Sequence, residues 1–456
     1  MYRLASLLTF LPAFIAIYYL VMASERVVRL PAPVQIAPVL VLLAGSLWLL
    51  SGSPVALLVF ASVAATLVLA VVIERTRASN PGVSRAALAV SIAASVAFLA
   101  VARSWIPGIT FAFAGVTVIA CQEIALVVDL FRGRAGIAHP VIAAAHLLQF
   151  PVLPTGPLIG YQDSIRQWGK LDRAIGLGAF AYGMRRIAIG LIKLILIAGT
   201  LATPVDAIFA LPAANVSTDA AWLAAVCLAL QYYFRLSGCA DIAVGLGRVL
   251  GLRYPENFRR PYLACSVREF WRRWHVTSIA WLRDYLAFPM VGRDAPTLRL
   301  APNIVLGFVL LGLWYGGGWT VVGWAAYSSA FLALEAVGLE AALARRPRFI
   351  QRVYVLLVVA VGWTILRADS LASAAALLEA MAGLGGVARL TSVAYLTPQV
   401  SVALLVGLLG AGPLIPWLSR WRVSIDALTA SLAMMLASVW LLLWRVRLFL
   451  RARPRP

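Results

Sequence analysis

Charge is scarce in this sequence. Only 12% of its 456 residues are Asp, Glu, Lys or Arg, whereas soluble domains hold about 25%, and 62% of its residues are hydrophobic. The least apolar intervals, 160–175, 251–301 and 343–352, are each too short for an independent core. The composition therefore excludes a soluble globular protein and predicts a single membrane domain.

Cysteine and histidine are also few. The four cysteines have no CxxC spacing, which argues against a disulfide framework and a zinc site and favours small apolar packing residues. They are Cys121, Cys227, Cys239 and Cys265. Of only three histidines, His275 lies among charged residues. The sequence predicts no metal site and no bound cofactor.

Acidic residues are outnumbered by basic ones, 18 to 39, which gives a net charge of +21. The basic residues occupy short loops between apolar runs, as the positive-inside rule produces, and not one soluble face. We therefore predict no nucleic-acid partner, and we place the basic clusters, including the tail RVRLFLRARPRP, on the cytoplasmic side. This orientation puts the C-terminus in the cytoplasm.

Long apolar runs dominate what remains, and each is close to the roughly 20 residues that cross a bilayer. We expect about eleven spans, near 5–23, 33–50, 54–73, 86–102, 109–130, 176–200, 220–234, 302–331, 352–366, 398–418 and 427–444. The first could pass for a signal peptide, but its length favours an uncleaved span. Four prolines interrupt the apolar stretch 137–160, which predicts a re-entrant or kinked segment.

The stretch 253–290 is a dense polar island in this apolar chain. A turn at PENFRRPY precedes a predicted helix that starts near Ser266, where Ser266 and Glu269 have capping-box spacing. On one continuous helix, Phe270, Trp274, Thr277 and Trp281 share one face, and Arg268, Arg272, His275 and Ile279 share another. An interfacial helix explains these arginines and tryptophans without chemistry. The near-neutral pKa of histidine, however, suits proton transfer.

Ionisable side chains inside apolar runs are costly and face the protein interior, either in structural networks or at functional sites. Besides Gln122, the sequence places Glu123 and Asp129 in one such run and Lys193 in another. Arg235 and Asp241 are six residues apart in a third, roughly on opposite sides of an ideal helix, so they need not pair.

Several blocks follow one another in an order that resembles a known family. They are FLPAFIAIYYL (10–20), GVTVIACQEIALVVDLFRG (115–133), LLQFPVLPTGPLIGYQD (147–163), QYYFRLSGCADIAVGLGRVLGLRYPENFRRPY (231–262), EFWRRWHVTSIAWLRDYLAFPMVG (269–292), GLWYGGGW (312–319) and GWTILRADSLASA (362–374). In these blocks the chain resembles the membrane-bound O-acyltransferases, in the bacterial branch that includes alginate O-acetylation and lipoteichoic acid D-alanylation membrane proteins.

The resemblance implies an all-α polytopic membrane protein, with re-entrant and interfacial helices beside the spans and a central tunnel. One domain over 1–456 would comprise N-terminal helices 1–135, a core 136–375 and C-terminal helices 395–447. It would lie in the bilayer of the bacterial inner membrane and use a cytoplasmic acyl thioester, acetyl-coenzyme A or an acyl carrier protein. A periplasmic acyltransferase and a glycan synthase are the implied partners.

The resemblance also marks a site, and this sequence departs from it. His275 matches one of two family histidines at the reaction centre, but Tyr315 stands where GLWHG has the other. Tyrosine, with a pKa near 10, offers under about 1% phenolate at neutral pH, so Tyr315 is expected to donate a hydrogen bond. The expected substrate or donor contacts are Arg272, Arg273, Arg283, Asp241, Ser237 and Trp314.

A second departure replaces an acid of the family's YFDFSGYSD by Arg235, which needs a partner such as Glu123 or Asp241. Three hypotheses stay open. The chain is an O-acyltransferase that acts on an exported polysaccharide or other envelope acceptor; or it is a catalytically impaired relative that serves as a scaffold or conduit in polysaccharide assembly. A lipid or ion transporter of unrelated fold would predict inverted repeats, which the sequence does not show.

Overall fold

A computed structural model describes most of the chain. The described residues are 36, 40–41, 44–45, 53–105, 111–137, 139–152, 156–168, 176–212, 215–287, 304–312, 318–384 and 391–412. Their regular structure is helical, with no β-strand, as the sequence predicts. They form two compact units: the first draws on 1–184, 243–259 and 274–329, and the second on 185–242, 260–273 and 330–456.

Within the described residues, six helices are long and apolar enough to cross a membrane, which agrees with a multi-pass protein. They are Val55–Thr76, Pro81–Ala102, Leu177–Phe209, Thr218–Val249, Trp319–Ala344 and Arg348–Arg367. The predicted count of eleven is not confirmed, because the predicted spans 5–23, 33–50 and 427–444 lie wholly or mostly outside the described residues. The predicted run 302–331 is not one helix: residues 304–312 are helical, and a new helix starts after Gly318, whose φ is +104°.

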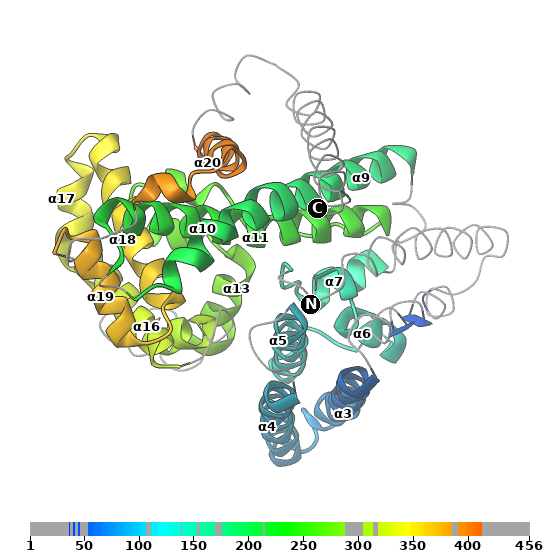
Figure 1. Ribbon diagram of the computed structural model, residues 1–456. Coiled ribbons are helices and arrows are strands. Elements are labelled where there is room, and N and C mark those ends of the chain that lie inside the picture. The colour runs from blue at the N-terminus through cyan, green and yellow to red at the C-terminus, as the bar shows by residue number, and fades with distance from the viewer. Residues whose placement is uncertain are drawn as a thin grey trace. The chain divides into compact units, whose positions relative to one another are not determined.

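Three helices of the first unit pack side by side: α3 (Ser53–Thr76), α4 (Pro81–Trp105) and α5 (Phe111–Phe131) (Figure 1). A fully buried carboxylate joins them. Glu123 of α5 accepts hydrogen bonds from Ser62 of α3, at 2.8 and 3.0 Å, and from Ser95 of α4, at 3.0 Å. This acid, flagged by the sequence, therefore lies in a structural polar network.

The end of α3 fixes the loop that follows α5. Arg77 Nη1 donates to the Leu130 carbonyl at 3.0 Å, and the Ile137 N–H donates to Glu74 Oε1 at 2.7 Å. Gly133 has φ +69°, a left-handed conformation that favours glycine, and a Cβ there would also displace the end of the Arg77 side chain. The loop leads into α6 (Pro140–Leu147), η1 (Phe150–Val152) and α7 (Tyr161–Trp168). These short helices confirm that the proline-rich stretch is broken.

Glycines bring two long helical segments close together. The segments are α9 (Leu177–Ile192), continued by η2 (Lys193–Ala198) and α10 (Gly199–Phe209), and α11 (Thr218–Val249). In the second unit, a Cβ on Gly190 would lie 2.6 Å from the Gly238 carbonyl oxygen. Such small residues let helix backbones approach within a membrane.

We expect Gly190→Ala to weaken this packing, because the added methyl group would meet the α11 backbone at the Gly238 carbonyl oxygen as well as the Ile242 side chain. The thermal unfolding midpoint in mild detergent should fall. Gly178→Ala is the matched control on the same helix, since a Cβ at Gly178 meets nothing within 4 Å and alanine favours helix by about 1 kcal/mol. Equal midpoints for the two variants would contradict the close contact.

Elsewhere in the second unit, α18 (Arg348–Arg367) packs against α12 (Val267–Arg273), η4 (Pro261–Leu263), α17 (Glu340–Ala344) and α19 (Leu371–Met381). η6 (Glu335–Leu339) continues α16 (Trp319–Leu334) into α17, and α20 (Pro398–Ala411), which follows η7 (Ser392–Tyr395), packs on η2 and α10. This packing buries Trp363 of α18 and Phe270 of α12 almost completely, which anchors α12 in an apolar environment.

Candidate functional site

The polar segment is two helices and not the single one that the sequence predicts. α12 ends at Arg273, and α13 (Val276–Trp281) then begins and runs into η5 (Leu282–Ala287). Between them His275 has φ +47° and ψ +48°, a left-handed conformation shared by only one other non-glycine residue of the described ranges, Arg260. That conformation costs roughly 1–2 kcal/mol and persists only where the surroundings impose it.

Asn257 imposes this break. The Val276 N–H donates to the Asn257 carbonyl at 2.9 Å, and the Thr277 N–H and hydroxyl donate to Asn257 Oδ1 at 3.1 and 2.9 Å. The Thr277 hydroxyl in turn accepts from the Leu158 N–H at 2.9 Å. Because Asn257 accepts hydrogen bonds from the first N–H groups of α13, it stabilises a new helix that starts here. The motif PENFRRPY predicts only a turn, so this role of its asparagine is visible only in the structure.

The break turns His275 inward. The prediction that it shares one helical face with Arg268 and Arg272 is wrong, because the helix ends before His275, and both arginines are exposed whereas His275 is fully buried. Its Nδ1 lies 3.2 Å from Ser278 Oγ, and the Phe258 ring packs edge-on with centroids 4.9 Å apart. These contacts orient the imidazole.

Burial also sets the protonation state of His275. Removal from water disfavours the charged imidazolium and lowers the pKa of His275 to about 3. The ring is therefore neutral at physiological pH and has a nitrogen that can take a proton. Full proton transfer to it requires a negative charge nearby, because an imidazolium alone is unstable in this environment.

Three acceptors hold the start of α12. Ser266 Oγ accepts from the Glu269 N–H at 3.0 Å, which confirms the predicted cap, and Glu269 Oε2 accepts from the Cys265 N–H at 2.6 Å. Glu335, which is 2% exposed, accepts from the Val267 and Arg268 N–H groups at 2.6 and 2.8 Å. No local pattern predicts this contact, because Glu335 lies almost 70 residues further along the chain in an apolar run.

Of the two arginines at the end of α12, Arg272 is exposed and Arg273 pairs with Glu269 one turn earlier. Asp241 and Ser237 lie one turn apart on α11, and both are buried. Asp241 binds Arg186 at 2.5 Å and Lys193 at 2.6 Å. The Asp241 carboxylate thus binds two cations other than Arg235. The sequence alone suggests Asp241 as one possible partner of Arg235.

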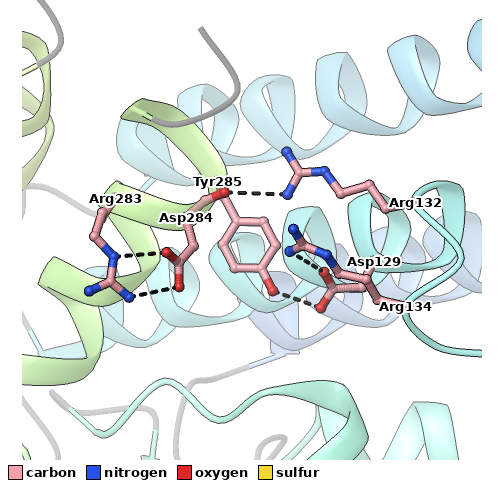
Figure 2. Close-up of polar contacts among 6 residues, drawn as sticks. All are labelled: Asp129, Arg132, Arg134, Arg283, Asp284 and Tyr285. Carbon is pink, nitrogen blue, oxygen red and sulfur yellow. Dashed lines mark hydrogen bonds and ion pairs between the residues drawn. The ribbon is translucent and has the colours of Figure 1, made fainter. Parts of the chain in front are cut away.

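Arg283, on η5 in the first unit, donates to both carboxylate oxygens of Asp284, at 2.8 and 3.1 Å (Figure 2). Arg132 donates to the Asp284 carbonyl at 3.3 Å and lies 6.0 Å from the Tyr285 ring centroid. The neighbouring carboxylate therefore balances the charge of Arg283, which remains more than half exposed.

Asp129, an acid that the sequence places inside an apolar run, lies beside these residues. The Tyr285 hydroxyl donates to Asp129 Oδ2 at 2.7 Å, and Arg134 lies 3.6 Å from Asp129 Oδ1 (Figure 2). These contacts join η5 to the end of α5. Trp281 adds a further tie, because its Nε1 donates to the Cys121 carbonyl at 2.9 Å.

The expected site residues therefore fall into separate groups. His275 and Arg283 belong to the first unit, whereas Asp241, Ser237, Arg272 and Arg273 belong to the second. Trp314 and Tyr315 lie outside the described residues. Across the ranges that the structure describes, no group of three or more His, Cys, Asp or Glu side chains is gathered as metal ligands would be.

Comparison with known proteins agrees with these features. The model of the membrane-bound O-acyltransferase family matches residues 134–367, just over half of the chain, and includes both halves of the broken helix. The chain belongs to the membrane-bound O-acyltransferase family. Its matched part contains His275, Asp241 and Glu335.

Curated relatives of this family member come from several bacteria. A probable alginate O-acetylase of Pseudomonas aeruginosa is 37% identical over 276 residues, which cover 59% of this chain and 52% of the relative. A peptidoglycan O-acetyltransferase of Helicobacter pylori is 30% identical over 269 residues, 58% and 50% of the two chains. A teichoic acid D-alanyltransferase of Bacillus subtilis is 26% identical over 217 residues, 45% and 54%. The chain spans about half the length of the curated relatives it matches.

Proposed function

We propose that this family member transfers an acetyl or other short acyl group to a hydroxyl group of an extracytoplasmic polysaccharide or cell-envelope polymer. The donor is a cytoplasmic thioester, acetyl-coenzyme A or an acyl carrier protein. The protein lies in the bacterial inner membrane with its C-terminus in the cytoplasm, and a periplasmic acyltransferase and a glycan synthase act beside it. Family membership supports acyl transfer, and the relatives include proteins named for acetylation and D-alanylation of envelope polymers.

The single observation that carries the proposal is the buried, neutral imidazole of His275, held by an imposed backbone break and by Ser278. In the proposed step the acceptor oxygen attacks the thioester carbonyl carbon as its proton moves to His275. The tetrahedral intermediate then expels the thiolate, the C–S bond breaks, and the proton on His275 passes to sulfur. The products are an ester and a free thiol, and the transient oxyanion supplies the negative charge that stabilises the imidazolium.

The other residues have supporting roles in this proposal. Tyr315 donates a hydrogen bond to the thioester carbonyl oxygen, and Trp314 packs against the acyl group. Arg272, Arg273 and Arg283 contact the phosphates or pantetheine of the donor. Of these, Arg272 is exposed and makes no ion pair within 4.0 Å among the described residues, so we assign it the strongest donor contact.

Tyr315 also favours a second candidate, a scaffold or conduit in surface-polysaccharide assembly that has lost transfer activity. The family histidine at this position is absent from the sequence, and tyrosine is too weak an acid–base group to replace it at neutral pH. Such a protein would keep the fold and the membrane location without turnover.

The deciding experiment expresses the chain in a strain that makes the acceptor polymer and measures the ester content of that polymer. The gene should raise ester content, and Tyr315→Phe should lower the transfer rate by about 10-fold or more through loss of one hydrogen-bond donor. Equal ester content with and without the gene would exclude the proposed transferase function. A silent parent that gains transfer on Tyr315→His would support the scaffold.

A further inference from the structure

Two arginines beside the end of α5 make no ion pair with any residue that the structure describes. Arg77 Nη1 donates to the Leu130 carbonyl at 3.0 Å, and Arg132 Nη1 donates to the Asp284 carbonyl at 3.3 Å. Both acceptors are neutral backbone groups. The two guanidinium groups therefore bring two positive charges to this part of the first unit.

The acids beside Arg132 each have an arginine of their own. Asp284 accepts two hydrogen bonds from Arg283. Asp129 lies 3.6 Å from Arg134. In Figure 2 the dashed lines lead from each carboxylate to a different arginine, whereas Arg132 reaches only a carbonyl. The carboxylates therefore offset the charges of their own arginines and leave that of Arg132 in place.

Helix capping explains only part of the position of Arg77. The last carbonyls of α5 attract a cation, but the helix dipole supplies only about half of one negative charge. Glu74, the acid nearest to Arg77 in the chain, accepts instead from the Ile137 N–H, and exposed Arg75 beside it offsets its charge. More than one positive charge thus stays unbalanced at the end of α5.

The turn after α5 brings the cations together and leaves them accessible. A Cβ on Gly133 would lie 2.3 Å from Arg77 Nη1, so the Arg77 guanidinium lies against the residue that follows Arg132. Arg134 comes next in the chain. Arg77 and Arg134 are exposed, and Arg132 is half-buried. Each guanidinium has five N–H donors in a planar fork that matches phosphate oxygens, and a backbone carbonyl takes only one of them.

We propose that Arg77, Arg132 and Arg134 form a binding site for a phosphate group. Phosphate fits better than a carboxylate, because a phosphate monoester carries about 1.5 to 2 negative charges at neutral pH and the excess here is more than one charge. Arg77 directly follows α3, which is long and apolar enough to cross a membrane, so the site lies at the depth of lipid headgroups. The phosphate belongs to a lipid headgroup or to the acyl donor, and the inference rests on the proposed function only for the second source.

A phosphate in this site also acts on the helix that follows His275. Arg132 contacts η5 through the Asp284 carbonyl and lies 6.0 Å from the centroid of the Tyr285 ring. η5 continues α13, which starts directly after His275. A ligand that holds Arg132 and Arg134 therefore stabilises the contact between η5 and the end of α5, which should raise the thermal unfolding midpoint.

The test measures binding, not turnover, on the full chain in nanodiscs of phosphatidylcholine. One arm compares coenzyme A with pantetheine, which lacks the phosphates, and the other replaces about one third of the lipid by phosphatidic acid, a phosphate monoester. At least one phosphate arm should raise the thermal unfolding midpoint of the unmodified protein by about 2 °C or more, whereas pantetheine should not. The arm that responds identifies the source of the phosphate.

Variants separate this site from general charge. Arg132→Gln and Arg134→Gln should each weaken binding by about 10-fold or more, through loss of a charge-assisted hydrogen bond, as measured by the ligand concentration at half of the full shift. Arg132→Lys keeps the charge and should bind more tightly than Arg132→Gln. Arg77→Gln also loses its bond to the α5 carbonyl, so its ligand-free midpoint should fall as well. Arg253→Gln, at an exposed arginine of the same unit, should bind like the unmodified protein.

Three results would overturn the site: no shift in either phosphate arm, undiminished binding in both Arg132→Gln and Arg134→Gln, or an equal loss in Arg253→Gln. Because no acyl transfer is measured, the two proposals fail separately. A chain that binds phosphate at these arginines but forms no ester contradicts the proposed transferase and leaves the phosphate site standing.

Discussion

Acyl transfer by His275→Ala should be at least about 100-fold slower than by the unmodified chain, because a positioned general base contributes about 10²- to 10⁴-fold. The fully buried imidazole has no neighbouring histidine to replace it within the polar segment 253–287. Ester formation on the acceptor polymer, normalised to protein in the membrane, is the measurement. Ser278→Ala should have a smaller effect, because it removes only the contact to Nδ1.

His139→Ala is the matched control. His139 also uses its Nδ1, which accepts from the Val141 N–H at 3.2 Å as the cap of α6, so this variant loses a histidine and a hydrogen bond but no proposed catalytic group. It should keep nearly full transfer. Equal losses in His275→Ala and His139→Ala would show that both act through folding, and full activity in His275→Ala would exclude it as the base.

The pH profile tests the same residue. Since burial lowers the pKa of His275 to about 3, the imidazole is unprotonated from about pH 5 upward and the base is not lost at the usual histidine pKa near 6.5. Transfer should therefore show no fall between pH 7 and pH 5.5 that is due to His275. If the transfer rate fell with a midpoint near pH 6.5, and this fall were absent in His275→Gln, the imidazole would be in contact with water, which would contradict its burial.

Glu335→Ala should lower the free energy of unfolding by about 2–4 kcal/mol, because it leaves the Val267 and Arg268 N–H groups without their charged acceptor. These groups start the helix that ends with Arg272 and Arg273. Denaturant unfolding in mild detergent measures the change. Glu335→Gln should lose roughly half as much, since the amide keeps one acceptor oxygen.

Glu340→Ala provides the comparison, since Glu340 lies five residues further on and contacts Arg268 at 3.6 Å, with both side chains substantially exposed. An exposed pair of this kind contributes about 0–1 kcal/mol. Similar losses in the two variants would mean that Glu335 acts by general charge and not as the acceptor at the start of α12.

The helical periodicity of the polar segment shows where sequence reasoning fails. The capping spacing of Ser266 and Glu269 is local, and the structure confirms it. The continuation of that helix through His275 is wrong, because Asn257, 18 residues earlier, offers two acceptors to the first N–H groups of α13. A local pattern holds no information about such a competing partner, so the periodicity alone places His275 on the same helical face as Arg268 and Arg272.

Charge shows the same division. Composition alone determined that the chain is a helical membrane protein, since apolar runs of this length can satisfy their backbone groups in lipid only as helices. Ordered motifs pointed to the family, which the comparison establishes. Only the tertiary structure decided which partners the buried acids bind. Asp241 pairs with Arg186 and Lys193, Glu123 accepts hydrogen bonds from two serines, and Glu335 accepts from the first N–H groups of α12. The physical reason is that hydropathy and periodicity depend on neighbours in the chain, whereas buried polar groups must find partners wherever packing brings them together.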